Sequence, residues 1–166
     1  ENISIQKGRY RFTNENLNNP KAVDYYNIDL DAESLVVDGD DIYINIDALS
    51  FDDFRGLKVS KLKTCFSITP REMNFQELVI QTRDSDIRGE ILFSYDEGGL
   101  DDFENDVFIN ADFDRATIAT NDLIHFYDEF GKNHKFYMQN TLVRGTLNDF
   151  KVLHANISGL DRSFVK

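Results

Sequence analysis

Three acidic residues are spaced so that they could converge on a cation. Asp29, Asp31 and Glu33 stand two residues apart, so on a β-strand their carboxylates point to the same side. Carboxylate oxygens are ligands that calcium prefers. Asn27 precedes them on that side and apolar residues occupy the other, which is typical of a strand with a solvated outer face. We interpret the three acids as surface residues and expect no metal site among them.

The histidines and the single cysteine form no recognisable catalytic or zinc-binding pattern. His125, His134 and His154 are scattered along the chain, and no serine or cysteine stands in a nucleophile-elbow sequence. Cys65 fits as a small apolar filler of a strand. A glycosidase-type pair could be drawn from the 30 acidic residues, but no feature of the sequence selects one. We therefore predict that the chain is not an enzyme and holds no metal or cofactor.

Composition and charge exclude a large class of partners. The formal net charge is -12, which repels the phosphate backbone of nucleic acids. No apolar run approaches the roughly 20 residues that span a bilayer, and no signal peptide is present. Because the chain begins at Glu1 and stops just after a new strand-like stretch, we expect it to be a piece of a longer protein. Any membrane anchor should then lie outside this fragment.

Apolar and polar residues alternate along most of the chain, which is the pattern of β-strands with one buried face. We predict an all-β fold of roughly ten to twelve strands. A closed barrel, a sandwich and an extended curved sheet all fit this pattern. The alternating stretches are Ile3–Ile5, Tyr10–Phe12, Tyr26–Leu30, Leu35–Val37, Ile42–Ala48, Leu62–Ile68, Leu78–Ile80, Ile87–Phe93, Val107–Phe113, Met138–Leu142 and Leu153–Ile157.

One β-hairpin stands out in this pattern. Asp38-Gly39 separates the apolar residues of 35–37 from those of 42–48. An Asp-Gly pair between alternating stretches is a strong signal for a two-residue hairpin turn.

One segment has the period of a helix instead. Leu123, Phe126, Tyr127 and Phe130 are spaced as i, i+3, i+4 and i+7, which places them on one side of a helix. Asn121 suits the N-cap, the acid at 122 suits the first turn, and the glycine at 131 suits the exit. The spacing predicts one short amphipathic helix near 122–130.

Longer stretches resemble the AsmA-like, TamB-related envelope proteins, particularly those of Bacteroidetes-type bacteria. The resemblance is carried by FINADFDRATIATNDLIHFY (108–127), a strand that runs into an Asp-Leu-x-x-Phe helix, and by FYMQNTLVRGTLNDFKVLHANI (136–157), a strand, a Gly-Thr-Leu turn and another strand. Residues 41–95 resemble the same family's succession of strands. Together these stretches cover most of the chain.

This resemblance implies a fold and a function. The fold is a repetitive antiparallel sheet curled into an open groove or taco-like β-solenoid, of which residues 1–166 would be one segment. The protein would be periplasmic and anchored in the inner membrane. It would move phospholipids towards the outer membrane, assemble β-barrel proteins there, or do both, and an outer-membrane barrel of the TamA type would be its partner.

Two apolar stripes are the candidate lipid-groove residues. We expect them to lie on the same inner face of neighbouring strands and to contact phospholipid acyl chains. The alternative is an extracellular carbohydrate- or protein-binding β-sandwich, which would bury both inner faces and keep aromatic side chains exposed for sugars. The absence of Trp slightly disfavours sugar binding. The stripes consist of Ile42, Ile44 and Ile46, and of Ile87, Ile91 and Phe93.

Overall fold

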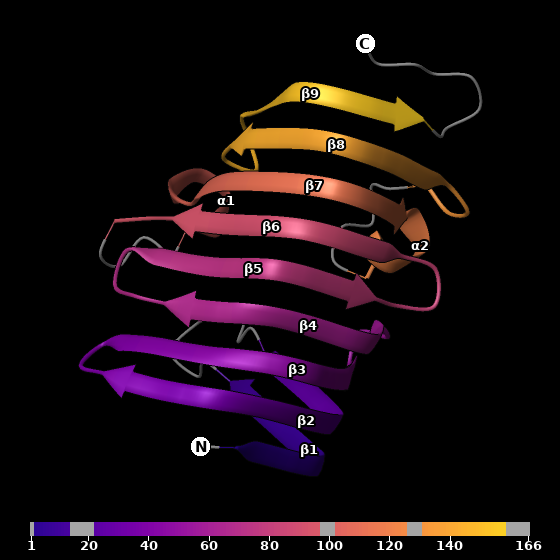
Figure 1. Cartoon of the computed structure of the whole chain (residues 1–166). Helices are drawn as coiled ribbons and strands as arrows, with labels where there is room; N and C mark the ends of the chain where they lie inside the picture. Colours follow the sequence, from indigo (N-terminus) through magenta and orange to yellow (C-terminus); the bar gives the residue numbers. More distant parts are fainter. Residues whose placement is uncertain (1, 14–21, 97–101, 126–130, 159–166) are drawn as a thin grey trace.

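Nine antiparallel strands form one sheet whose order follows the sequence from β1 to β9 (Figure 1). The computed structural model describes residues 2–13, 22–96, 102–125 and 131–158. Within these ranges β1 and β9 do not pair with each other, so the sheet is open. The strands are β1 Ile3–Thr13, β2 Ala22–Asp38, β3 Asp41–Asp53, β4 Lys58–Ile68, β5 Glu72–Gln81, β6 Asp86–Ser94, β7 Phe108–Ala119, β8 Lys135–Gly145 and β9 Phe150–Ser158.

The predicted all-β antiparallel class is confirmed, but the sheet is not strongly curled and the predicted number of strands was too high. The stretches predicted at 3–5 and 10–12 are one strand, β1, and those at 26–30 and 35–37 are one strand, β2. The sequence pattern predicts a strand end wherever the alternation stops. In β1 and β2 the strand instead continues through these positions.

β-bulges explain these gaps. The pairing of β1 with β2 shifts register between Ile5 and Gly8, and that of β2 with β3 shifts between Tyr26 and Asp29. Lys7 has φ 53 beside the first shift. A bulge inserts an extra residue and bends the strand without ending it. It also changes which residues of the strand point to which face, because the side-chain period is two.

The predicted hairpin is confirmed. Asp38 pairs with Asp41, and residues 39 and 40 form the turn between β2 and β3. Gly39 has φ +59, a left-handed conformation that glycine adopts without the steric penalty of a side chain.

Two very short helices lie at opposite ends of the strands (Figure 1). They are α1, Phe103–Asp106, and α2, Thr120–Leu123. The helix predicted near 122–130 begins earlier, with Ala119 as its N-cap, and ends at Leu123. Asn121, predicted as the N-cap, instead bonds to Asn133. The predicted apolar positions 126, 127 and 130 lie outside the described residues. No described helix has the length and apolar character needed to cross a membrane.

A single layer of sheet buries little of its surface. A compact monomer of 19.2 kDa exposes about 8,400 Å², whereas this chain exposes 11405 Å². Most of the fully buried hydrophobic residues that the structure describes are small or lie at strand ends: Ala32, Val59, Leu78, Tyr95, Val107, Ala111, Ala116 and Ala119. Apart from Leu78 and the buried residues at strand ends, the larger apolar side chains in the described part of the sheet are half-buried or exposed. Most of the apolar surface is thus not enclosed in a core.

Gly89 of β6 allows β7 to approach closely, and this contact generates a stability prediction. A Cβ at this position would lie 2.0 Å from the carbonyl oxygen of Asp112 and 2.9 Å from Cα of Phe113. Because both atoms belong to the backbone of β7, Gly89→Ala should separate the strands and cost about 3 kcal/mol or more. Gly39→Ala meets no atom within 4 Å and should cost only about 1 kcal/mol. Urea denaturation of both variants measures the difference, and equal losses would contradict the prediction.

Candidate functional site

One face of the sheet is apolar from β3 to β8. Residues that are partners across neighbouring strands share a face, so the pairing defines rows that cross the sheet. One such row runs from β3 to β8, and we call it the central apolar row. It consists of Ile44, Phe66, Phe75, Ile91, Ala111 and Val143. Each member is the partner of the next. All except Ala111 are half-buried.

Two further rows flank the central apolar row on the same face. The first consists of Ile42, Ile68, Met73, Phe93, Ile109 and Gly145. The second consists of Leu49, Leu62, Ile80, Ile87, Ala116 and Met138. Together the three rows form a continuous apolar surface, which we call the apolar face.

Five of the six predicted groove residues belong to the apolar face, and Ile46 points to the same side of β3 but pairs with Thr64 outside the three rows. The two stripes are not on neighbouring strands. Ile42, Ile44 and Ile46 belong to β3, and Ile87, Ile91 and Phe93 belong to β6. Strands β4 and β5 lie between them. Ile42 is exposed and the other five are half-buried.

The residues that join the two stripes were missed as site residues. They are Phe66 and Ile68 of β4 and Met73 and Phe75 of β5. The alternation in β4 was visible in the sequence, but which strands pair was not. In a sheet whose order follows the sequence, the strands between two stripes must contribute to the same surface.

A ladder of phenylalanine rings crosses the apolar face near one end of the strands. Ring centroids are 4.9 Å apart for Phe66 and Phe75, 6.0 Å for Phe75 and Phe93, and 5.4 Å for Phe93 and Phe103. These separations and tilted geometries favour aromatic contact. Phe103 belongs to α1, so this helix folds onto the end of the apolar face. We call these four residues the phenylalanine ladder.

The deepest part of the apolar face follows a line of bulges. Register shifts interrupt β3–β4, β4–β5 and β5–β6 at similar levels. Thr64 and Leu78 lie beside these shifts and Thr141 lies beside the shift in β8–β9, and all three are at most 2% exposed. The Thr64 hydroxyl donates to the Gln76 carbonyl oxygen at 2.7 Å, so its polarity is satisfied locally.

The opposite face is polar and contains the acids considered for calcium. Asp29, Asp31 and Glu33 are exposed, which confirms their interpretation as surface residues. Asp29 accepts from the backbone N–H of Lys7 and Asp31 accepts from the hydroxyl of Ser4, both at 2.9 Å. Within the described residues, no group of three or more His, Cys, Asp or Glu side chains is arranged to hold a metal ion.

The histidines and the cysteine are not brought together. His125 lies against Gly56, where an added Cβ would be 2.9 Å from its Cε1 atom. His134 pairs through its backbone with Thr120, and His154 is exposed on β9. Cys65 is half-buried on the polar face, opposite residue 45 of β3. These side chains lie on separate elements.

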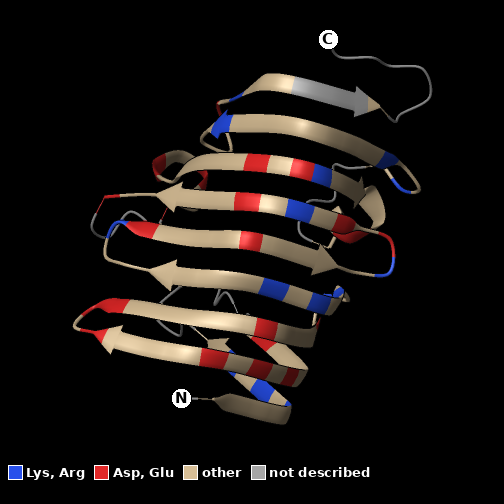
Figure 2. Cartoon of the chain, in the orientation of Figure 1, with Lys and Arg blue, Asp and Glu red and all other residues tan. Residues whose placement is uncertain are grey.

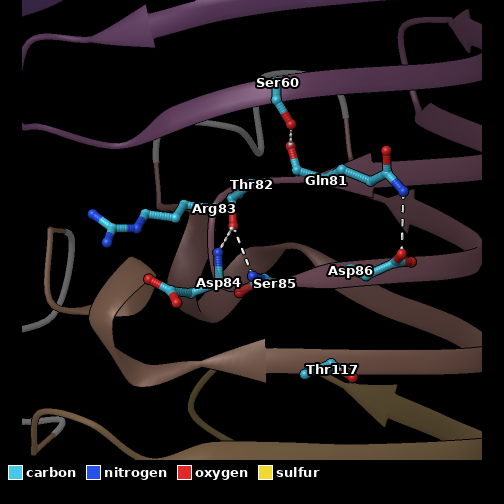
Figure 3. Close-up of a pocket in the computed structure, with 8 residues that line it drawn as sticks. All are labelled: Ser60, Gln81, Thr82, Arg83, Asp84, Ser85, Asp86 and Thr117. Carbon is cyan, nitrogen blue, oxygen red and sulfur yellow. Dashed lines mark hydrogen bonds between the residues drawn. The ribbon is translucent and has the colours of Figure 1, made fainter.

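A polar hollow of about 310 Å³ lies at the β5–β6 turn (Figure 3). Its groups bond mainly to one another. The Ser60 hydroxyl donates to the Gln81 carbonyl oxygen at 3.0 Å, and the Thr82 hydroxyl oxygen accepts from the backbone N–H groups of Asp84 and Ser85. The hydroxyls at 82 and 85 both donate to Asp122 of α2. The hollow is thus part of a clamp that ties α2 to the β5–β6 turn.

A second hollow, of about 240 Å³, lies on the polar face. Arg144 Nε donates to Asn110 Oδ1 at 3.0 Å within it. Its floor includes Leu92 and Leu142, and carboxylates and amides surround them. No aromatic side chain lines this hollow.

A buried ion pair closes the β3–β4 turn. Asp53 is 1% exposed and accepts from Arg55 through the backbone N–H at 2.7 Å, Nε at 2.8 Å and Nη2 at 2.6 Å. These hydrogen bonds hold the pKa of the Asp53 carboxyl below its ordinary value, although burial by itself would raise it. The positive charge of Arg55 and, to a smaller extent, that of His125 act in the same direction.

Comparisons with known proteins assign no relative to this chain. No family model, no curated protein and no solved structure matches it.

The lowered pKa of Asp53 predicts how stability depends on pH. A carboxyl whose pKa is lower in the folded state stabilises the fold above its unfolded pKa of about 3.9. This stabilisation is lost as the pH falls through the lower folded pKa. Asp53→Asn should cost about 2 kcal/mol at pH 7 and reduce the loss of stability on acidification. Urea denaturation from neutral to acidic pH tests this, and a variant with the same pH slope as the wild type would contradict it.

Proposed function

We propose that the apolar face binds phospholipid acyl chains, as one segment of a TamB-related, AsmA-like envelope protein. The observation that supports this most is the uninterrupted apolar face of an open, single-layer sheet. Most of its side chains are half-buried, and a partly exposed apolar surface of this extent normally marks a binding site for an apolar partner.

The dimensions of the apolar face suit an acyl chain. Neighbouring strands lie about 4.8 Å apart, so the central apolar row extends about 24 Å from β3 to β8. The acyl region of one bilayer leaflet is about 15 Å thick. A chain of this length can therefore lie entirely on the apolar face.

The energetics favour lipid over water on this surface. Each methylene that leaves water for an apolar surface contributes roughly 0.8 kcal/mol. Half-buried Ile, Phe and Met side chains also lose water contact when a chain covers them, and no hydrogen bond is broken. Acyl chains of different lengths and saturation should bind, because apolar contact is not directional.

The wider context is part of the same proposal. A periplasmic protein anchored in the inner membrane could extend this surface towards the outer membrane, where a TamA-type barrel would be its partner. Further strands at the free edges of β1 and β9, together with a tighter curl, would give the groove or taco form. The segment would then act as a passive, non-enzymatic conduit for phospholipid transport, barrel assembly, or both.

A protein-binding β-sandwich is the second candidate. The same half-exposed apolar face favours it, because a second sheet packed about 10 Å away would bury these side chains. The two candidates differ in what covers the apolar face, so crosslinking from this face distinguishes them.

Crosslinking from the central apolar row tests the proposal. A photoreactive amino acid at Ile44 or Ile91 of the full-length protein should capture phospholipid in cells. With the probe at Ile91, Ile44→Asp should lower lipid capture about tenfold, because an unpaired carboxylate on the apolar face must be desolvated. Asn45→Asp adds the same charge to the adjacent residue on the polar face and should have little effect.

The possible outcomes separate the two candidates. Capture of a protein segment in place of lipid at both positions would favour the sandwich. If neither position captures lipid, and Ile44→Asp cells with normal protein levels grow normally, the lipid proposal is wrong.

A further inference from the structure

The two ends of the strands differ in charge. The turns β2–β3, β4–β5, β6–β7 and β8–β9 lie at one end of the sheet, which we call the acidic rim (left in Figure 2). The described basic residues near this rim are Arg71, Arg144 and Lys151, and the last two are partners across β8 and β9. The described acids are Asp38, Asp40, Asp41, Glu72, Asp96, Asp102, Glu104, Asp106 and Asp149. None of these acids forms an ion pair within the described part of the chain.

The opposite end of the sheet, which we call the paired rim, has ion pairs among its described residues. It contains the turns β3–β4, β5–β6 and β7–β8. Its ion pairs join Arg55 to Asp53 at 2.6 Å, Lys58 to Asp52 at 3.2 Å and Lys135 to Asp84 at 3.6 Å. Arg83 and Lys132 are exposed and form no ion pair with described residues. The Arg83 guanidinium extends away from the β5–β6 hollow (Figure 3).

The two halves of the apolar face also differ along the strand direction, one being aromatic and the other ending in polar groups. The phenylalanine ladder lies in the half next to the acidic rim: Phe93 is the second-last residue of β6, and Phe103 belongs to α1. The end next to the paired rim contains the polar groups of the clamp, including Ser85, Thr120 and Asp122. Strand β4 extends about 26 Å from Phe66 to Lys58. An acyl chain of about 15 Å that ends on the ladder thus brings its headgroup into the half next to the paired rim.

On the basis of the proposed function, we infer that phospholipids bind with one orientation: acyl ends on the phenylalanine ladder and the headgroup phosphate towards the paired rim. The acids of the acidic rim repel a phosphate, whereas Arg83 and Lys132 attract it. Clefts and edges lined by charges of one sign impose such a preference on an anionic ligand. The ligand class is therefore a phospholipid whose headgroup phosphate the two rims orient.

Spin-label distances test the orientation. Phe54 and Pro70 are exposed residues in the turns at either end of β4, one on each rim. Nitroxides are attached to Phe54→Cys and, separately, Pro70→Cys in the full-length protein with Cys65→Ser. The protein is loaded from phosphatidylglycerol vesicles that contain a phospholipid with a nitroxide on its headgroup. The mean distance to the headgroup should be shorter from position 54 than from position 70.

A matched pair of charge variants tests whether the charges of the two rims cause this lipid orientation. Arg83→Glu with Lys132→Glu should lower the uptake of phosphatidylglycerol about threefold or more. Arg71→Glu with Lys151→Glu gives the same net charge but changes the acidic rim, and uptake should stay close to that of the wild type.

The outcomes are distinguishable. Bound lipid whose headgroup is equally distant from both labels, or closer to position 70, would overturn the orientation and leave lipid binding intact. Equal effects of the two charge variants would overturn the role of the rims. A protein that takes up no lipid would overturn the proposed function, and this inference with it.

Discussion

The fold depends on keeping the apolar rows of β3 to β8 on one face of the sheet. In a β-strand a slip of one residue moves all side chains to the opposite face. Nearly every strand pair here contains a register shift, yet Ile44, Phe66, Phe75 and Ile91 remain partners across four strands. The bulges at neighbouring levels compensate one another. This agreement between strands gives a single layer one apolar and one polar surface.

A single layer also leaves its apolar surface without a full cover. The two short helices of the described residues lie at the ends of the strands, where Phe103 packs on Phe93 and Asp122 accepts from the β5–β6 turn. Stability must therefore come mainly from the backbone ladder and from contacts within the face, such as the ring contact of Phe66 with Phe75. Because the sheet is a single layer, its apolar face stays partly accessible. The alternating sequence thus gives both the sheet and the apolar face that we propose as the binding surface.

Much of the fold could be predicted from the sequence, because alternation and Asp38-Gly39 are local signals. The number of strands could not, because bulges such as those near Gly8 and Asn27 interrupt alternation as strand ends do. The candidate site was predicted in part. Ile44 and Ile91 share a face, but the alternation alone does not show that consecutive strands pair, which places β4 and β5 between them. The clamp around Asp122 was missed, since Thr82 and Ser85 lie 40 and 37 residues away from it.

The most direct test is to ask what occupies the apolar face in the purified protein. Native mass spectrometry of the full-length protein, followed by lipid extraction, identifies any bound molecule. We expect copurified phospholipid in the wild type and its loss in Phe75→Asp, which places a charge at the centre of the apolar face. Asn74→Asp, on the polar face of the same strand, should retain it. A wild-type protein that is folded and free of lipid would contradict the account.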